Sequence, residues 1–349
     1  MTANRLQRLH GSAVATAGAV LLLCAAPLPA QKTDTVVLRN GDRITGEIKN
    51  LDRGRLSYST DDMGNLAIEW DKVVRITSRH YFEVELESGR RHFGSLKPAA
   101  RDSQMVVAVA EFSDTVHLAT VVRIYPIETG FLKRINGYLD VGFTFQRANR
   151  VSQLTLGTEA THRTPQWLNR LRVSFYFQDQ EGVEGTSRNS GSLNSQRFFG
   201  DRWSALGAAQ LEQNEELDLD LRALFGAGVG RFLVQSNRGT FQASGGLTYT
   251  SERFAGSGSS ANLEGFLGAE LAFFRLDRPK ADIRATLATY PSLTDPGRVR
   301  VDFDMRIAYE VLKDFTLGLT FFDSFDSRPP GQGGASNDFG TTVSVGWTF

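Results

Sequence analysis

The chain has 349 residues, with 39 basic side chains, 39 acidic side chains and a single cysteine, Cys24. The charges balance, and no basic block or acidic tail stands out, so the sequence gives no case for binding nucleic acid. After residue 30, no stretch approaches the roughly 20 apolar residues of a membrane-spanning helix. If the rest of the chain sits in a membrane, it must therefore do so as a closed β-barrel.

The first thirty residues have the three-part pattern of a secretory signal peptide. Arg5 and Arg8 precede an apolar run at residues 13–26, and small residues and proline lead to Ala30. The run is short for a transmembrane helix, which favours a cleaved signal over a buried N-terminal helix. A lipoprotein anchored at Cys24 is an alternative, but the leucine before this cysteine is too large for the usual motif. We predict a signal peptide over residues 1–30 and export across the inner membrane.

Residues 31–127 contain an internal repeat with a constant offset of 48. Residues 36–42 align with residues 84–90, Gly46 aligns with Gly94, and residues 73–76 align with residues 121–124. Each copy alternates apolar and polar residues and carries turn residues, which is typical of β-hairpins. The two glycines predict a bulge or a sharp bend. Two copies are too few for a solenoid, so we predict a small periplasmic module of two tandem repeats.

The first copy, "Leu-x-Asn-Gly-Asp-x-Ile-x-Gly-x-Ile", resembles the small five-stranded barrel of Sm-like proteins. Further strands are expected at residues 55–60 and 66–70. Many Sm-like proteins bind RNA, but no basic-aromatic surface is evident here, so a spacer or a periplasmic protein-binding role is the better interpretation. His80, His92 and His117 are not at metal-ligand spacing. We predict no metal and no cofactor.

Residues 134–349 carry the pattern of a transmembrane antiparallel β-barrel. Residues 299–310 alternate strictly between apolar and charged or small side chains, and several strands approach the 9–11 residues that cross a bilayer. Residues 179–192 and 324–337 are expected to be long outer loops, and short links such as residues 200–202 periplasmic turns. We predict about twelve strands, with ten as the alternative because residues 193–199 are weakly patterned. The strands are expected at residues 137–147, 151–162, 168–178, 193–199, 202–213, 217–234, 239–252, 261–276, 279–290, 298–310, 314–323 and 338–349. An even count places both barrel ends in the periplasm.

The alternation also predicts which side chains meet lipid and which face an enclosed polar centre. Rings near strand ends suit the membrane interfaces, and we expect this of Tyr138, Trp203, Tyr249, Tyr309 and Trp347. The polar phase carries charges of both signs that are expected to point inward: Asp218, Asp220, Arg222, Glu264, Glu270, Asp282, Arg284, Arg300, Asp302, Asp304, Arg306 and Glu310.

The last residues carry a signal of their own. Val343, Val345, Trp347 and Phe349 alternate with small or polar residues, and Phe349 ends the chain. This pattern resembles the C-terminal signature by which the outer-membrane assembly machinery recognises barrels. That machinery and outer-membrane lipid are therefore the predicted partners.

Four short motifs resemble the salt-induced outer-membrane protein family. They are Phe-Gly-Asp-Arg-Trp at residues 199–203, Gly-Ala-Gly-Val-Gly at 226–230, Tyr-Pro-Ser-Leu at 290–293, and residues 323–330. The resemblance covers about residues 134–349 and implies an outer-membrane barrel. The family has no known function and supplies no catalytic residues, and the N-terminal repeat lies outside it.

Function is the least determined property. A structural or narrow-pore transport barrel with a periplasmic interaction module is the preferred hypothesis, and an interaction protein with a plugged barrel is the alternative. A lipid-modifying enzyme would need a nucleophile beside a base, but Ser152 and His162 lie at opposite ends of one expected strand. We therefore predict no enzyme and no catalytic, cofactor-binding or metal-binding residues.

Overall fold

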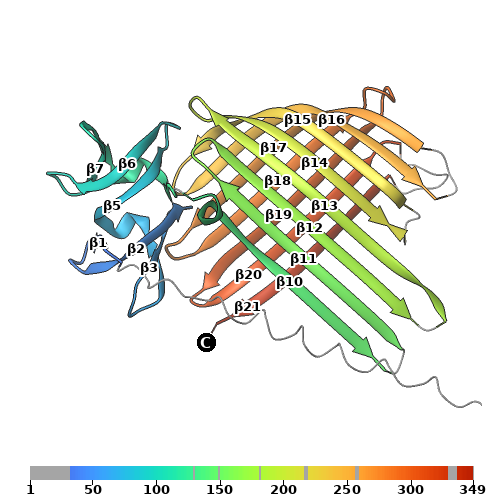
Figure 1. The fold of residues 1–349 in the computed structure, drawn as a ribbon, viewed down its shortest axis with the longest axis horizontal. Helices are drawn as coiled ribbons and strands as arrows, with labels where there is room; N and C mark the ends of the chain where they lie inside the picture. The colour runs from blue at the N-terminus through green and yellow to red at the C-terminus, as the bar shows by residue number, and fades with distance from the viewer. Residues whose placement is uncertain are drawn as a thin grey trace, which may run out of the picture. The chain divides into compact units, whose positions relative to one another are not determined.

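A computed structural model describes residues 32–128, 130–147, 150–180, 182–215, 219–255, 259–328 and 336–348, and Figure 1 draws the fold. Residues Thr33–Phe349 form one compact unit. The predicted signal peptide, Asp218 and Phe349 lie outside the described residues. Over those residues, no helix has both the length and the apolar character needed to span a bilayer.

The N-terminal part is a nine-stranded module. The predicted hairpin is present, since β1 pairs with β2 across a turn at Gly41, whose φ of 91° favours glycine. Two short 3-10 segments, η1 (Trp70–Lys72) and η2 (Leu118–Thr120), interrupt the strands. The strands are β1 (Asp34–Leu38), β2 (Arg43–Asp52), β3 (Arg55–Ser59), β4 (Asn65–Glu69), β5 (Val73–Leu86), β6 (Arg91–Pro98), β7 (Gln104–Val109), β8 (Phe112–His117) and β9 (Val121–Pro126).

The two repeats share a strand and a core. The first half of β5 completes the first repeat, and its second half opens the second repeat, so β1, β2, β9 and β5 pair in a closed ring. This ring is the small barrel that the Sm-like resemblance implied, with four strands rather than five. Trp70 and Leu118 are equivalent positions of the two copies, and the indole of Trp70 donates a 2.7 Å hydrogen bond to the Leu118 carbonyl. The two copies therefore fold as one body.

Gly46 stands at a close approach of two strands. A Cβ atom there would lie 2.5 Å from the Ser59 carbonyl oxygen and 2.5 Å from the Tyr58 ring. Gly46 pairs in register with Asp34 of β1, and the irregularity in β2 falls later, between Ile48 and Asn50. The glycine is thus needed for strand packing at a bend, while the bulge lies just beyond it.

The C-terminal part is one twelve-stranded antiparallel sheet in sequential order (Figure 1). Its strands are 11 to 17 residues long, which confirms twelve strands rather than ten. They are β10 (Ile135–Gln146), β11 (Val151–Arg163), β12 (Trp167–Gln180), β13 (Val183–Phe199), β14 (Trp203–Asn214), β15 (Leu219–Gln235), β16 (Gly239–Phe254), β17 (Ser259–Arg275), β18 (Ala281–Pro291), β19 (Val299–Leu312), β20 (Phe315–Asp326) and β21 (Asn337–Trp347).

One expected loop is mostly strand. Residues 179–192 were predicted to be a long outer loop, but β13 begins at Val183 and pairs with both neighbours. Positions such as Asn189 and Gly191, which lie opposite Phe175 and Val173, are not apolar. The alternation that marks the other strands is therefore missing, although the backbone pairing is complete.

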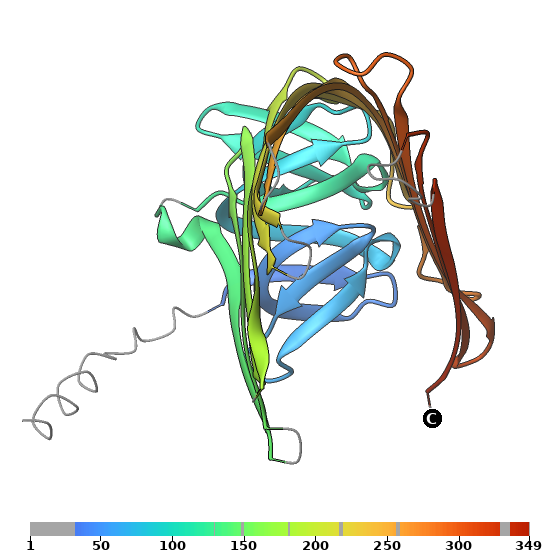
Figure 2. The same ribbon diagram turned by 90° about the vertical axis from the view of Figure 1, so that its right-hand side faces the viewer.

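The sheet curves strongly, as Figure 2 shows. A cavity lined by residues from Leu168 on β12 to Tyr290 on β18 spans seven strands, so these side chains lie on the concave face. Most of them belong to the polar phase, while the apolar phase is exposed on the convex face; Phe143 is 70% exposed and Val343 65%. The predicted division into two faces is confirmed.

Two positions depart from the predicted phase. Tyr138 lies opposite Glu159, which lies opposite Arg172, so Tyr138 belongs to the concave polar face and not to the convex ring of aromatics. Asp220 falls in a register shift of β15 and pairs with Arg253, whose neighbour Glu252 faces inward. A local bulge reverses the face of a side chain without changing the sequence pattern.

The pairing ends at two free strand edges. The registers run without interruption from β10 to β21, and over the described residues none joins β10 to β21.

Candidate functional site

The N-terminal module lies against the short links at one end of the curved sheet. The Arg91 guanidinium donates to the Pro165 carbonyl at 2.9 Å, between β11 and β12. Arg202, between β13 and β14, donates to the Glu87 carbonyl at 3.0 Å, and Asn237, between β15 and β16, donates to the Val121 carbonyl at 2.7 Å. The module thus contacts three successive short links.

Arginines also reach past the links to the concave face. The module's guanidinium groups stack on three phenylalanines: Arg53 on Phe274 at 4.7 Å, Arg91 on Phe198 at 4.5 Å and Arg123 on Phe232 at 5.2 Å. These rings lie opposite Asp282, Ser204 and Gln242, which are concave-face positions. In the reverse direction, Arg163 of β11 stacks on the module's Tyr125 at 3.7 Å. These four cation–π contacts, each worth about 0.5–2 kcal/mol, therefore hold the module against the short-link end of the concave face.

Two carboxylates are buried beneath these arginines. Glu83 and Glu85 of β5 are 3% and 2% exposed, and Arg91 lies 3.4 Å from Glu83 and 3.7 Å from Glu85. Burial raises the pKa of Glu83, and this effect exceeds the opposing attraction of Arg163 and Arg91. Burial acts in the same sense on Glu85, but Arg123 at 3.2 Å, together with Arg91 and Gln235, holds the pKa of Glu85 below its usual value. The charged form of Glu83 therefore weakens the packing of the module against the sheet (its docking), whereas the charged form of Glu85 strengthens it.

Exchange of each carboxylate for an amide should separate the two effects. Because the folded-state pKa of Glu83 is raised, its contribution to stability falls as the pH rises from the unfolded-state value through the folded one. Glu83→Gln is therefore expected to strengthen docking at neutral pH. The pKa of Glu85 is lowered, so its stabilisation is present at neutral pH and is lost on acidification. Glu85→Gln removes the nearer of the two carboxylates that pair with Arg123 and leaves Asp52 at 3.5 Å, so it should cost about 2 kcal/mol.

The measurement is the urea concentration that exposes the module to trypsin in the full chain at pH 7. The two variants have the same size and differ only in the site of the exchange, so each is the control for the other. Shifts of the same sign in both would contradict the opposed electrostatics.

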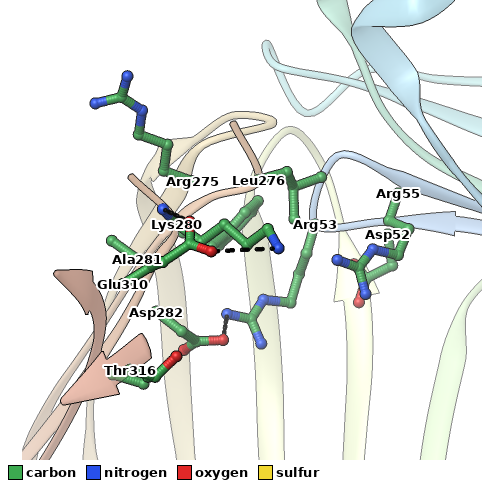
Figure 3. Close-up of a pocket in the computed structure, with 12 residues that line it drawn as sticks. Asp52, Arg53, Arg55, Arg275, Leu276, Lys280, Ala281, Asp282, Glu310 and Thr316 are labelled. Atoms are coloured by element: carbon green, nitrogen blue, oxygen red, sulfur yellow. Dashed lines mark hydrogen bonds and ion pairs between the residues drawn. The ribbon is translucent and has the colours of Figure 1, made fainter. Parts of the chain in front are cut away.

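A cavity of about 330 Å³ lies between the β2–β3 turn and the concave wall (Figure 3). Arg53 reaches from the turn to Asp282, with 2.8 Å between Nη2 and Oδ2, and Lys280 lies 3.7 Å from Glu310. A second cavity of about 170 Å³ also borders Arg53 and Asp52, and is lined further by Arg123, Glu270 and Arg284. Arg53 therefore lines both cavities.

The predicted inward charges are only partly paired. Arg222 bridges Glu212 at 3.2 Å and Glu252 at 2.7 Å, and Arg300 forms a bidentate pair with Glu264 at 3.1 and 2.5 Å. Arg284 contacts Asp282 at 3.3 Å. Within the described chain, four of the predicted charges take part in no ion pair: Glu270, Asp302, Asp304 and Arg306.

The histidines form no assembled site in the described part of the chain. Ser152 and His162 lie at opposite ends of β11, which separates them by about 33 Å at 3.3 Å per residue. His80, His92 and His117 each contact a different side chain: Asp34, Asp114 and Gln104. No group of His, Cys, Asp and Glu within the described residues could hold a metal ion.

Sequence reasoning missed the arginine–aromatic contacts altogether. A signal was available: Phe198, Phe232 and Phe274 are large aromatic side chains at polar-phase positions, each beside a short link. A large aromatic ring at a polar-phase position indicates a partner on that face of the sheet, and here that partner is the module.

The chain is similar to one described family. The family described as "Protein of unknown function, DUF481" matches residues 139–349, more than half of the chain. No curated protein and no solved structure matches the chain.

Proposed function

We propose that this chain, which belongs to the DUF481 family, is an outer-membrane β-barrel channel whose N-terminal module covers the periplasmic mouth. The convex face supports membrane insertion, because exposed apolar side chains cover it along most of the strands, with few on β13. Soluble monomers rarely expose apolar patches above a few hundred Å². Strands of 11 to 17 residues are long enough to cross a bilayer, which takes 9–11 residues, and the longer strands would extend beyond it.

Insertion requires the free edges to meet. Unpaired backbone groups are too costly in hydrocarbon, and β10 and β21 run antiparallel because ten strands separate them. Their convex faces match: Leu139, Val141 and Phe143 on β10, and Val343 and Val345 on β21. We infer that these edges pair in the bilayer. The same apolar face of β21 supports recognition by the barrel assembly machinery.

The observation that carries the proposal is the arginine stacking on the concave phenylalanines. A module that rests only on the short links would be a neighbouring domain. A module that fills concave positions at Phe198, Phe232 and Phe274 controls access to the lumen. The lumen behind it is lined by polar side chains and contains unpaired charges, as a water-filled path requires.

The experiment locks the module in place. Lys72 of the module and Asp277 of the β17–β18 link lie 3.4 Å apart and are half exposed. The chain without residues 1–30 has no native cysteine. A cleavable bismaleimide across Lys72→Cys and Asp277→Cys should suppress single-channel conductance in planar bilayers, and cleavage of the linker should restore it.

The single variant Lys72→Cys, treated with the same reagent, is the control. Equal conductance in the locked and released protein would contradict a covering role. Silence in both states would mean a filled barrel, and the alternative of an interaction protein would then hold. Its surface would be the β8 edge of the module, where Phe112 is 83% exposed.

A further inference from the structure

One cavity in the wall of the sheet is partly apolar, against the predicted polar lumen. It has a volume of about 430 Å³ and is lined by seven consecutive strands, β12 to β18. Leu206 and Leu224 contribute apolar walls, and the rings of Phe266 and Tyr290 stack with centroids 5.9 Å apart. The amides of Asn194, Gln196 and Gln210 add polar groups to the lining. A cavity of this size that combines apolar and aromatic walls with placed polar groups is typical of a small-molecule site.

Gly226 leaves the cavity open because it has no side chain, and close packing of the strands does not require a glycine there. A Cβ atom on Gly226 would lie 3.3 Å from the Thr248 side chain, 3.7 Å from that of Ala208 and 3.7 Å from the Leu247 carbonyl oxygen, all in residues that line the cavity. A Cβ atom on Gly228 would instead lie 2.5 Å from the Gly245 carbonyl oxygen. The strand therefore tolerates a side chain at position 226, and that side chain would occupy the cavity.

The cavity has one charged group. Among the described residues that line it, only Arg170 carries a charge. Arg170 and Arg172 share a single carboxylate, Glu159, at 3.4 and 2.6 Å, so the three groups leave one positive charge uncompensated. The Thr248 hydroxyl, buried and without a hydrogen-bond partner in the described residues, adds a polar atom.

We propose that this cavity binds an aromatic monocarboxylate, which is the solute class of the proposed channel. The flat apolar body packs against Gly226, Leu224 and the Phe266–Tyr290 pair, and the carboxylate meets the unbalanced charge at Arg170. A small anion such as acetate would lack the apolar contacts. An aromatic cation would meet the positive charge of Arg170.

The probe is 2-naphthoate, measured by equilibrium dialysis against the full mature chain in lipid nanodiscs. We expect saturable binding, with 2-naphthylmethylammonium and acetate each bound at least about tenfold more weakly. Gly226→Leu should weaken 2-naphthoate binding about tenfold or more by filling the cavity. Arg170→Gln should do the same and also remove the preference for the anion over the cation.

Two matched controls test whether these effects are local. Gly157→Leu makes the same exchange on the concave face outside the cavity, where a Cβ atom would meet nothing within 4 Å. Arg306→Gln removes an inward arginine that does not line the cavity. Both should bind 2-naphthoate as the parent chain does. Equal affinity for the anion and the cation, or undiminished binding by Gly226→Leu, would overturn the proposal.

This inference rests on the proposed function, but the two can fail separately. If the protein binds 2-naphthoate as described yet never conducts, the site stands and transport fails. If it conducts and is insensitive to 2-naphthoate, with no binding in dialysis, the channel stands and this site does not.

Discussion

Cysteines placed on the two free edges of the sheet are expected to form a disulfide within one chain once the protein is in a bilayer. Val141 of β10 and Val343 of β21 both lie on the convex face. We expect Val141→Cys with Val343→Cys to cross-link in high yield on mild oxidation, because directly opposed strand residues lie within the range that a disulfide spans.

The register follows from the stagger of the strands. Ile135 is the first residue of β10, at the short-link end of the sheet. Its register partners, traced from strand to strand, lead through Asn169 and Gly207 to Gly265 on β17. The short-link end of β17 is Arg275, ten residues further along the chain. Ten residues of rise, about 33 Å, over seven strand spacings, about 34 Å, give a tilt of about 45°. Closed barrels tilt by about 35–45°, which for twelve strands means a total stagger of about 12 to 17 residues.

Only even values of the stagger keep the two faces matched. When the registers are followed from β10 to β21, a total stagger of about 14 residues places Val141 opposite Val343. A stagger of about 12 places it opposite Thr341, and one of about 16 opposite Val345. The cross-link scan therefore uses these three partners. Val141→Cys with Ser344→Cys is the control, because Ser344 faces the other side of the sheet.

Non-reducing gels of unboiled and boiled samples separate the outcomes. A cross-link within one chain should fix a compact band that resists boiling. Exclusive cross-links between two chains would mean that a second copy completes the sheet, and no cross-link with any partner would contradict closure.

Removal of the Arg300 guanidinium is expected to destabilise the sheet by about 3–5 kcal/mol. Glu264 is only 1% exposed, and its two carboxylate oxygens each accept a hydrogen bond from the Arg300 guanidinium. Arg300→Ala leaves this carboxylate buried without a charge partner, and the loss of a buried partner costs far more than a surface pair is worth. The measurement is the urea midpoint of unfolding in detergent micelles, followed by the gel mobility of unboiled samples.

Two further variants make the result specific. Arg306→Ala deletes the same charge on the same strand, but Arg306 has no ion pair in the described chain and should cost less than about 1 kcal/mol. Glu264→Gln with Arg300→Gln removes both charges and should recover much of the loss. A cost for Arg306→Ala equal to that for Arg300→Ala would show that net charge, and not the pair, matters.

The sequence by itself determined the strands and their faces. Alternation at residues 299–310 follows from the period of two in a pleated strand, so it predicts β19 and its outward Val301 and Phe303 without knowledge of any neighbour. The offset of 48 predicted the repeated hairpins in the same way, because both signals lie within a short stretch of chain. The same reasoning failed for β13, where the convex positions carry little apolar character and only the pairing with β12 and β14 reveals a strand.

Only the tertiary structure decided what these elements do together. Three features join residues far apart in the chain: both repeats use β5, Glu264 pairs with Arg300, and Arg91 stacks on Phe198. Such contacts depend on strand stagger and on the curvature of the sheet, which sum over many registers. A period of two records which side a residue faces, but not which distant residue it meets there.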